Sequence, residues 1–145
     1  MNKPTAAVML IIRRDGHLLA VWSPRYHGWL LPGGRVESDE LEEECAAREL
    51  VETTGLVTSE LGASELAALD LDLVYVAPNR ITGEHAARSA NVFVFRSGTL
   101  GGEPKETVQG RPVRWMRPDE FLEICPFHDF YGRMIAAGVD MSPTV

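Results

Sequence analysis

Cysteine is scarce in this chain, which has only two such residues among 145, Cys45 and Cys125. They lie far apart and belong to no CxxC motif, so the pattern argues against a disulfide framework and against a thiolate metal site. We therefore expect two buried or half-buried thiols, as in a protein of the reducing cytosol, and predict a cytoplasmic location.

Basic residues are also in deficit, because 14 lysines and arginines stand against 21 aspartates and glutamates, for a net charge of -7. Long nucleic acids bind to basic surfaces, so this balance argues against them as partners. Nucleotides stay open as ligands, since a metal ion can bring their phosphates to an acidic site.

Long apolar runs are missing as well. The run near the N-terminus is stopped by Arg13 and Arg14. It is too short to span a membrane, so we interpret it as a strand rather than a signal and expect no membrane partner. The composition, 45% hydrophobic and 24% charged, is that of an ordinary globular protein. No repeat or linker divides the chain, and we expect one domain over residues 1–145.

Apolar alternation and turn residues predict a mixture of strands and helices. Residues 5–13 and 17–22 flank a turn at Asp15-Gly16, which predicts a β-hairpin. Further strands are expected at 29–31, 57–61, 69–73, 89–96 and 112–116, helices at 118–124 and 127–137, and a loose tail at 141–145. In the strand at 69–73 the aspartates are expected to face solvent, and Pro78 to end the segment. This order is not a regular βαβ repeat, so we predict a mixed α/β (α+β) fold with a sheet between helices.

Residues 33–56, GGRVESDELEEECAARELVETTGL, combine a glycine pair with an acidic helix. Ser38 or Asp39 is expected to cap the helix, and Gly55 to stop it. The two glycines permit a close backbone approach and would be able to expose a carbonyl to a metal ion. A plain strand-to-helix turn explains them equally well.

A helical wheel sorts the glutamates of this helix. It places Glu42, Glu49 and Glu52 in one sector with Cys45 and Thr53, and small or aliphatic residues opposite them, toward a core. Because Glu49 and Glu52 stand three residues apart, their carboxylates share a face and repel each other. A divalent ion would convert that repulsion into binding, since Mg2+ prefers carboxylate oxygens. A solvated acidic face is the alternative.

The same stretch resembles the Nudix box, written G-x5-E-x7-R-E-U-x-E-E-x-G-U with U a bulky aliphatic residue. The pattern falls in register on Gly34, Glu40, Arg48, Glu49, Leu50, Glu52, Gly55 and Leu56. One position departs, because Thr53 replaces the second glutamate of the E-E pair. The lead-in at 29–32 and the Arg114-Trp115 pair before a Pro-Asp-Glu segment also look like this family.

The resemblance implies a Nudix fold, an α/β/α sandwich with a mixed β-sheet between helices. It also implies Mg2+-dependent or Mn2+-dependent hydrolysis of a nucleoside diphosphate linked to another group, by water attack at phosphorus. The substrate would be a small nucleotide such as a (d)NTP or a nucleotide sugar. Members of this family are often homodimers, so a homodimer is also among the expectations.

By the same resemblance, Glu49 and Glu52 are expected to be catalytic residues and metal ligands. Glu49 is also a candidate for orienting or deprotonating the attacking water. The carbonyl of Gly34, or of Gly33 beside it, is expected to help hold the metal.

Glu40 and Arg48 have a supporting role in the resemblance. They are expected to form an ion pair that fixes the geometry of the loop and the helix.

Thr53 stands where the family carries a metal ligand, and a neutral hydroxyl is a weak ligand for Mg2+. We expect weaker metal binding and slower turnover. Glu42, Glu103 or Glu106 would be able to compensate, or the enzyme would use fewer ions. The alternative function is a catalytically weak or inactive Nudix domain that binds nucleotides as a sensor or regulator.

Arg25, Tyr26 and His27 lie in a predicted loop before the glycine pair. An aromatic ring there would be able to stack on a base, so these three residues are candidates for substrate binding.

Overall fold

The computed structural model describes residues 6–54, 71–81, 88–97, 107–108, 111–139 and 141. Its helices are α1 (Glu42–Thr54), α3 (Pro118–Ile124) and α4 (His128–Ala136). Its strands are β1 (Ala6–Ile11), β2 (Arg13–Arg14), β3 (His17–Ser23), β4 (Gly28–Leu30), β5 (Gly33–Arg35), β6 (Leu71–Ile81), β7 (Arg88–Ser97), β8 (Thr107–Val108) and β9 (Arg111–Met116).

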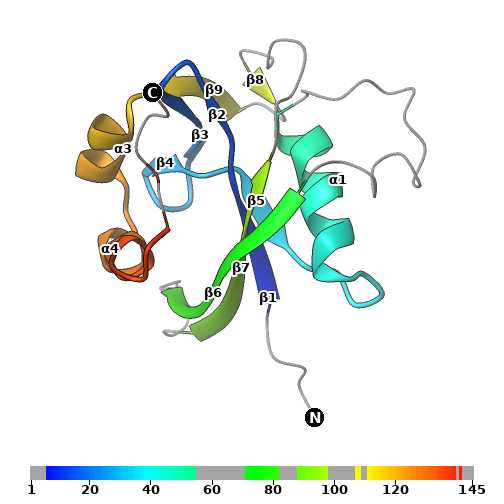
Figure 1. The fold of residues 1–145 in the computed structure, drawn as a ribbon. Coiled ribbons are helices and arrows are strands. Elements are labelled where there is room, and N and C mark those ends of the chain that lie inside the picture. Colours follow the sequence, from blue (N-terminus) through cyan, green and yellow to red (C-terminus); the bar gives the residue numbers. More distant parts are fainter. Residues whose placement is uncertain are drawn as a thin grey trace.

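The strands lie between helices, as the sequence predicts, but they form two sheets instead of a single sheet. One has the order β5-β1-β7-β6, and the other has the order β2-β3-β9-β8 with β4 paired to β3. The first sheet is mixed, because β1 runs parallel to β7 while β1 and β5 are antiparallel, and the pairings of the second sheet are all antiparallel. Figure 1 shows α1 on one side of the strands and α3 and α4 on the other. The α/β/α sandwich is therefore confirmed.

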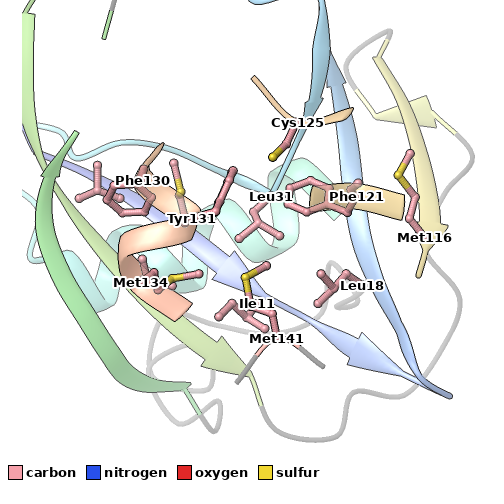
Figure 2. Packing of buried hydrophobic residues seen from close by; sticks show 14 residues of the cluster. Ile11, Leu18, Leu31, Met116, Phe121, Cys125, Phe130, Tyr131, Met134 and Met141 are labelled. Atoms are coloured by element: carbon pink, nitrogen blue, oxygen red, sulfur yellow. The ribbon is translucent and has the colours of Figure 1, made fainter. Parts of the chain in front are cut away.

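Strand β1 is buried on both faces, which explains its unbroken apolar sequence. Val8 and Leu10 pack in the cluster that also contains Cys45, Ala46 and Leu50 of α1. Met9 and Ile11 point to the other side and join the cluster built on α3 and α4. Figure 2 shows that second cluster, in which Leu31 and Ile11 lie among aromatic and methionine side chains from α3, α4, β9 and the segment after α4, namely Phe121, Phe130, Tyr131, Met134, Met116 and Met141. The carboxylate-bearing helix α1 is thus anchored on a rigid central strand.

The predicted hairpin is only partly present. Asp15 and Gly16 have positive φ angles of 51° and 77° and form the expected turn. Only the short strand β2 pairs with β3, however, while β1 lies between β5 and β7. The doubly apolar β1 requires cover on both faces, and a central position supplies that cover where a two-stranded hairpin would not.

Strand β6 differs from its prediction in length and in exposure. It continues through Pro78 to Ile81 and forms the edge of its sheet, where a residue without an N–H group is tolerated. Asp72 is exposed as expected, but Leu73 is also 51% exposed. A register shift between Leu73 and Tyr75 breaks the two-residue alternation, which accounts for this difference.

The C-terminal helices confirm the sequence boundaries closely. Helix α3 begins with Pro118 at its first turn, and α4 is followed by Gly138 with a φ of 101°. Met141 was expected in a loose tail but is only 2% exposed in the core. The expected strand at 57–61 lies outside the described residues. Among the described helices, none has the length and apolar character needed to cross a membrane.

Candidate functional site

Helix α1 begins at Glu42, two residues later than a cap at Asp39 would place it. The Leu41 carbonyl accepts the first helical hydrogen bond, from Cys45, and the Leu41 N–H donates to the Glu44 carboxylate at 3.0 Å. This is half of a capping box, with a glutamate at the third helical position. The expected caps Ser38 and Asp39 are therefore wrong, because both lie exposed in the preceding turn.

Cys45 is fully buried and packs with the core, although the wheel placed it among the acidic residues. Its thiol donates to the Arg35 carbonyl at 3.5 Å, so it links the start of the helix to β5. Burial raises the pKa of Cys45 to about 12. Cys45 is thus a structural thiol, as the small number of cysteines and the lack of a CxxC motif indicated.

Arg48 donates hydrogen bonds to three carboxylates, and the exposed carboxylate of Glu37 lies 3.9 Å from its Nη2 atom. It binds Glu40 with two hydrogen bonds, from Nε at 2.7 Å and from Nη2 at 3.0 Å. Its Nη1 atom donates to Glu49 at 3.0 Å and to Glu52 at 2.9 Å. Nη2 also donates to the Arg35 carbonyl at 3.2 Å. The predicted ion pair with Glu40 is present, and Arg48 in addition brings Glu49 and Glu52 to one point.

The charges of this cluster stabilise one another. The hydrogen bonds from Arg48 lower the pKa of Glu40, and those same bonds raise the pKa of the Arg48 guanidinium above its usual range. The side chains of Glu40 and Glu49 are 13% and 12% exposed, whereas that of Glu52 is 46% exposed. Three carboxylates around one cation leave the cluster net negative, which suits a second cation.

Gly34 lies against the carboxylate of Glu49. A Cβ atom at position 34 would lie 2.5 Å from the Glu49 Cδ atom and 2.9 Å from Oε2, too close for a real contact. At Gly33 the obstacle is main chain, because a Cβ there would overlap the Val8 carbonyl group of β1. The two glycines are thus required for different reasons, one by the carboxylate and one by the sheet.

The pairing register of β5 with β1 shows that the carbonyls of Gly33 and Gly34 point in opposite directions. Leu10 of β1 donates its N–H to the Pro32 carbonyl at 2.8 Å, and antiparallel pairing alternates residue by residue. Gly34 therefore turns its main-chain groups toward β1, while Gly33 turns its carbonyl away. The Arg35 carbonyl, two residues on, points the same way as that of Gly33 and meets Arg48. Of the two expected carbonyls, that of Gly33 is the better placed for a ligand on α1.

The donors at this site fit Mg2+ in number and kind. Among the described residues, no group of three or more His, Cys, Asp or Glu side chains is arranged to hold a metal ion. Mg2+ does not require such a group, since it commonly binds one or two carboxylates, water and substrate phosphates. Glu49 and Glu52, with the carbonyl of Gly33, would supply a set of this kind.

Of the three acids expected to compensate for Thr53, the structure describes only Glu42. Glu42 stands ten residues before Glu52 in α1, which separates the two by roughly 15 Å along the axis. Glu103 and Glu106 lie outside the described residues. Thr53 follows Glu52 in the last turn of α1.

The turn between β3 and β4 carries the predicted substrate-binding residues. The Arg25 guanidinium lies 5.4 Å from the centre of the Tyr26 ring, and Tyr26 makes an edge contact with Phe127 at 5.0 Å between centroids. His27 is exposed and has a φ of 49°. Gly28, which follows, packs on Pro126. The turn is therefore docked on the segment between α3 and α4.

Three features of the site were missed by sequence reasoning. The Arg35 carbonyl anchors both Arg48 and Cys45, but a main-chain acceptor leaves no signal in residue identity. The bond from Arg48 to Glu52 spans four residues of the helix and was predictable from that spacing. Contact of Tyr26 with Phe127 joins residues 101 positions apart and was not.

Comparison with known proteins gives a consistent result. The model of the NUDIX domain matches residues 1–137. A MutT-like protein of Streptomyces ambofaciens is 31% identical over 116 residues, which are 79% of this chain and 64% of that protein, so the chain spans less than two thirds of that relative. An RNA pyrophosphohydrolase of Rhizobium meliloti is 27% identical over 143 residues, 92% of this chain and 84% of its own length. The crystal structure of a MutT protein from Methanosarcina mazei Go1 aligns with a TM-score of 0.67 at 24% identity, over 97% of this chain and 99% of that one, and supports the fold.

Proposed function

The chain belongs to the Nudix hydrolase family, and on that premise we propose that it hydrolyses small nucleotides in which a diphosphate links a nucleoside to another group. Mg2+ or Mn2+ would be the cofactor. The observation that carries this proposal is the convergence of Glu49 and Glu52 on Arg48, with Glu49 against Gly34. A nucleoside monophosphate is expected among the products.

The residues of the site have separate roles in this reaction. A divalent ion, when bound, would neutralise the diphosphate and acidify its water. Glu49 and Glu52 with the carbonyl of Gly33 would hold that ion. Glu49 is also our candidate to take the proton of the attacking water, because Arg48 holds its carboxylate next to Gly34. Arg48 and Glu40 keep this carboxylate in position on the helix.

The proposed substrate contacts are Arg25, Tyr26 and His27. Tyr26 is half-buried, and its contact with Phe127 holds the ring in a fixed orientation. A fixed aromatic ring is a suitable surface for a nucleobase, and the neighbouring Arg25 guanidinium would attract phosphate. Free nucleotides are favoured over long nucleic acids because the chain carries a net charge of -7.

Nucleotide binding without turnover is the second candidate function. It is favoured by one observation, the threonine at position 53, which removes a carboxylate from the end of α1. A site with fewer ligands would retain a nucleotide more readily than it would hydrolyse one.

A hydrolysis screen distinguishes the two functions. The purified protein would be offered NTPs, dNTPs, 8-oxo-dGTP, ADP-ribose, nucleotide sugars, dinucleoside polyphosphates and a 5′-triphosphate RNA, each with Mg2+, Mn2+ or EDTA. Hydrolysis of at least one compound that requires the metal supports the enzyme. Binding of a panel member by equilibrium dialysis, with no product under any condition, supports the sensor and contradicts the hydrolase.

A further inference from the structure

Arg48 occupies the same two carboxylates that the proposed function assigns to the metal ion. Its Nη1 atom donates to Glu49 at 3.0 Å and to Glu52 at 2.9 Å. One nitrogen of a permanently charged group therefore lies between both ligands. In the described residues the site already contains a cation of its own.

A guanidinium cannot leave such a position by losing its proton. The hydrogen bonds to Glu40 favour the charged form of Arg48 still further. A divalent ion that binds Glu49 and Glu52 must therefore share their oxygens with Nη1 or move this nitrogen away. Two cations at one pair of carboxylates also repel each other.

The two ends of the guanidinium are held with unequal strength. On one end, Nε and Nη2 bind both oxygens of Glu40, which is 13% exposed, and Nη2 also meets the Arg35 carbonyl. On the other end, Nη1 bonds Glu49, which is 12% exposed, and Glu52, which is 46% exposed and four residues along the same helix. Exposed pairs of this spacing are weak. The bond to Glu52 is thus the one that yields.

We propose that Arg48 is a built-in competitor for the divalent ion, which remains bound to Glu40 while its Nη1 atom exchanges with the metal at Glu52 and Glu49. This inference rests on the proposed function, because it takes those two glutamates as metal ligands. It assigns Arg48 two effects of opposite sign. The residue stabilises the metal-free helix, and it weakens the affinity for the metal.

Calorimetric titration with Mg2+ alone, without nucleotide, tests this competition. Arg48→Lys keeps the charge but loses the fork, so it cannot bind Glu40 and bridge the other two carboxylates at once. Arg48→Gln loses both. We expect each variant to bind Mg2+ roughly threefold to tenfold more tightly than the unaltered protein. The matched control is Arg133→Gln, which removes the same charge from the exposed i,i+4 pair with Asp129 on α4 and should leave the affinity unchanged.

The outcomes separate this inference from the proposed function. Tighter binding in Arg48→Gln but not in Arg48→Lys would reduce the effect to net charge and overturn the competition. Unchanged or weaker binding in both variants overturns it as well, while leaving the hydrolase intact. Absence of Mg2+ binding in every form, with no hydrolysis in the screen, overturns both.

An NMR titration of the unaltered protein covers the case in which the Arg48 variants do not fold. Addition of Mg2+ should shift the Arg48 Nη1 signals, because this nitrogen loses its bond to Glu52. The Nε signal should stay in place, because it remains bonded to Glu40 at 2.7 Å. Nη1 signals that do not respond to saturating Mg2+ would contradict the proposal.

Discussion

The carboxylate of Glu49 rests on the main chain of Gly34, so closely that a Cβ atom at position 34 would lie 2.5 Å from its Cδ atom. The Oε1 atom of this carboxylate, the one nearest to position 34, also accepts a hydrogen bond from Arg48 at 3.0 Å. An added methyl group at position 34 would therefore displace the oxygen through which Arg48 positions Glu49. Position 34 should therefore control the geometry of the site rather than the stability of the fold.

Substitution of the two glycines should separate these properties. Gly34→Ala displaces the Glu49 carboxylate and should lower kcat/KM by about a hundredfold, the cost of a misplaced catalytic group. Gly33→Ala meets the Val8 carbonyl of β1 and should instead lower the free energy of unfolding by roughly 1–3 kcal/mol. Urea denaturation and nucleotide hydrolysis of both variants check this contrast. An equal effect of the two substitutions on stability would contradict it.

Removal of the charge on Glu40 should destabilise the fold through Arg48. Glu40→Gln loses charge-assisted bonds and should cost about 1.5–3 kcal/mol in urea denaturation at pH 7. The matched control is Glu120→Gln, because Glu120 is 42% exposed and lies 4.0 Å from Arg114. Its cost should stay below about 0.5 kcal/mol.

The same pair predicts a dependence of stability on pH. Because Arg48 lowers the pKa of Glu40 below 4.5, the carboxylate stabilises the native state above that value, and this contribution is lost as the pH falls through the lower, native pKa. Stability of the unaltered protein should thus decrease with acidification below about pH 5. The slope should be shallower in Glu40→Gln. Parallel slopes would show that Glu40 is not a linked group.

Restoration of the missing carboxylate tests the meaning of Thr53. Thr53→Glu adds an oxygen ligand at the end of α1, beside Glu52. We expect a lower Mg2+ concentration at half-maximal rate, with roughly a tenfold change for one added ligand. The measurement is the hydrolysis rate of Thr53→Glu and of the unaltered protein as a function of Mg2+ concentration. An unchanged metal requirement would indicate that another group already supplies the ligand.

Both thiols should be unreactive in the native protein. Cys45 and Cys125 are fully buried, and burial raises their pKa values to about 12 and about 11. Thiolate, the reactive form, is therefore scarce at pH 8. Titration with a thiol reagent should label neither residue quickly in buffer and both in denaturant. Rapid labelling of one thiol in buffer would contradict the packing of its helix.

The fold was predictable where local pattern and burial agree. Helices α3 and α4 follow from Pro118 and Gly138, whose backbone preferences act within a few residues. Partners of β1 were not predictable, because an apolar strand does not encode which neighbours cover it, and the hairpin prediction failed there. The extension of β6 past Pro78 depends on its place at the sheet edge, which only the assembled sheet defines.

The site was predictable in its residues more than in its geometry. The spacing of the Nudix box identified four residues of the site, and the structure shows them in contact: Glu40, Arg48, Glu49 and Glu52. The alternation of carbonyls along β5 was not readable from two adjacent glycines, so the choice between Gly33 and Gly34 required the register with β1. The helical wheel grouped Cys45 with the acidic face because it considers one helix alone. It does not show that β5 packs against the first turns of α1 and buries the thiol.

Hydrolysis by Glu49→Gln is the most direct test of the site. The variant keeps the size of the side chain but removes its charge, so the thermal unfolding temperature should change little while the proton acceptor is lost. At saturating Mg2+, with the best substrate of the screen, the rate should fall by at least about a hundredfold relative to the unaltered protein. A folded Glu49→Gln variant that hydrolyses this substrate at a rate within about twofold of the unaltered protein would contradict the assignment of the active site.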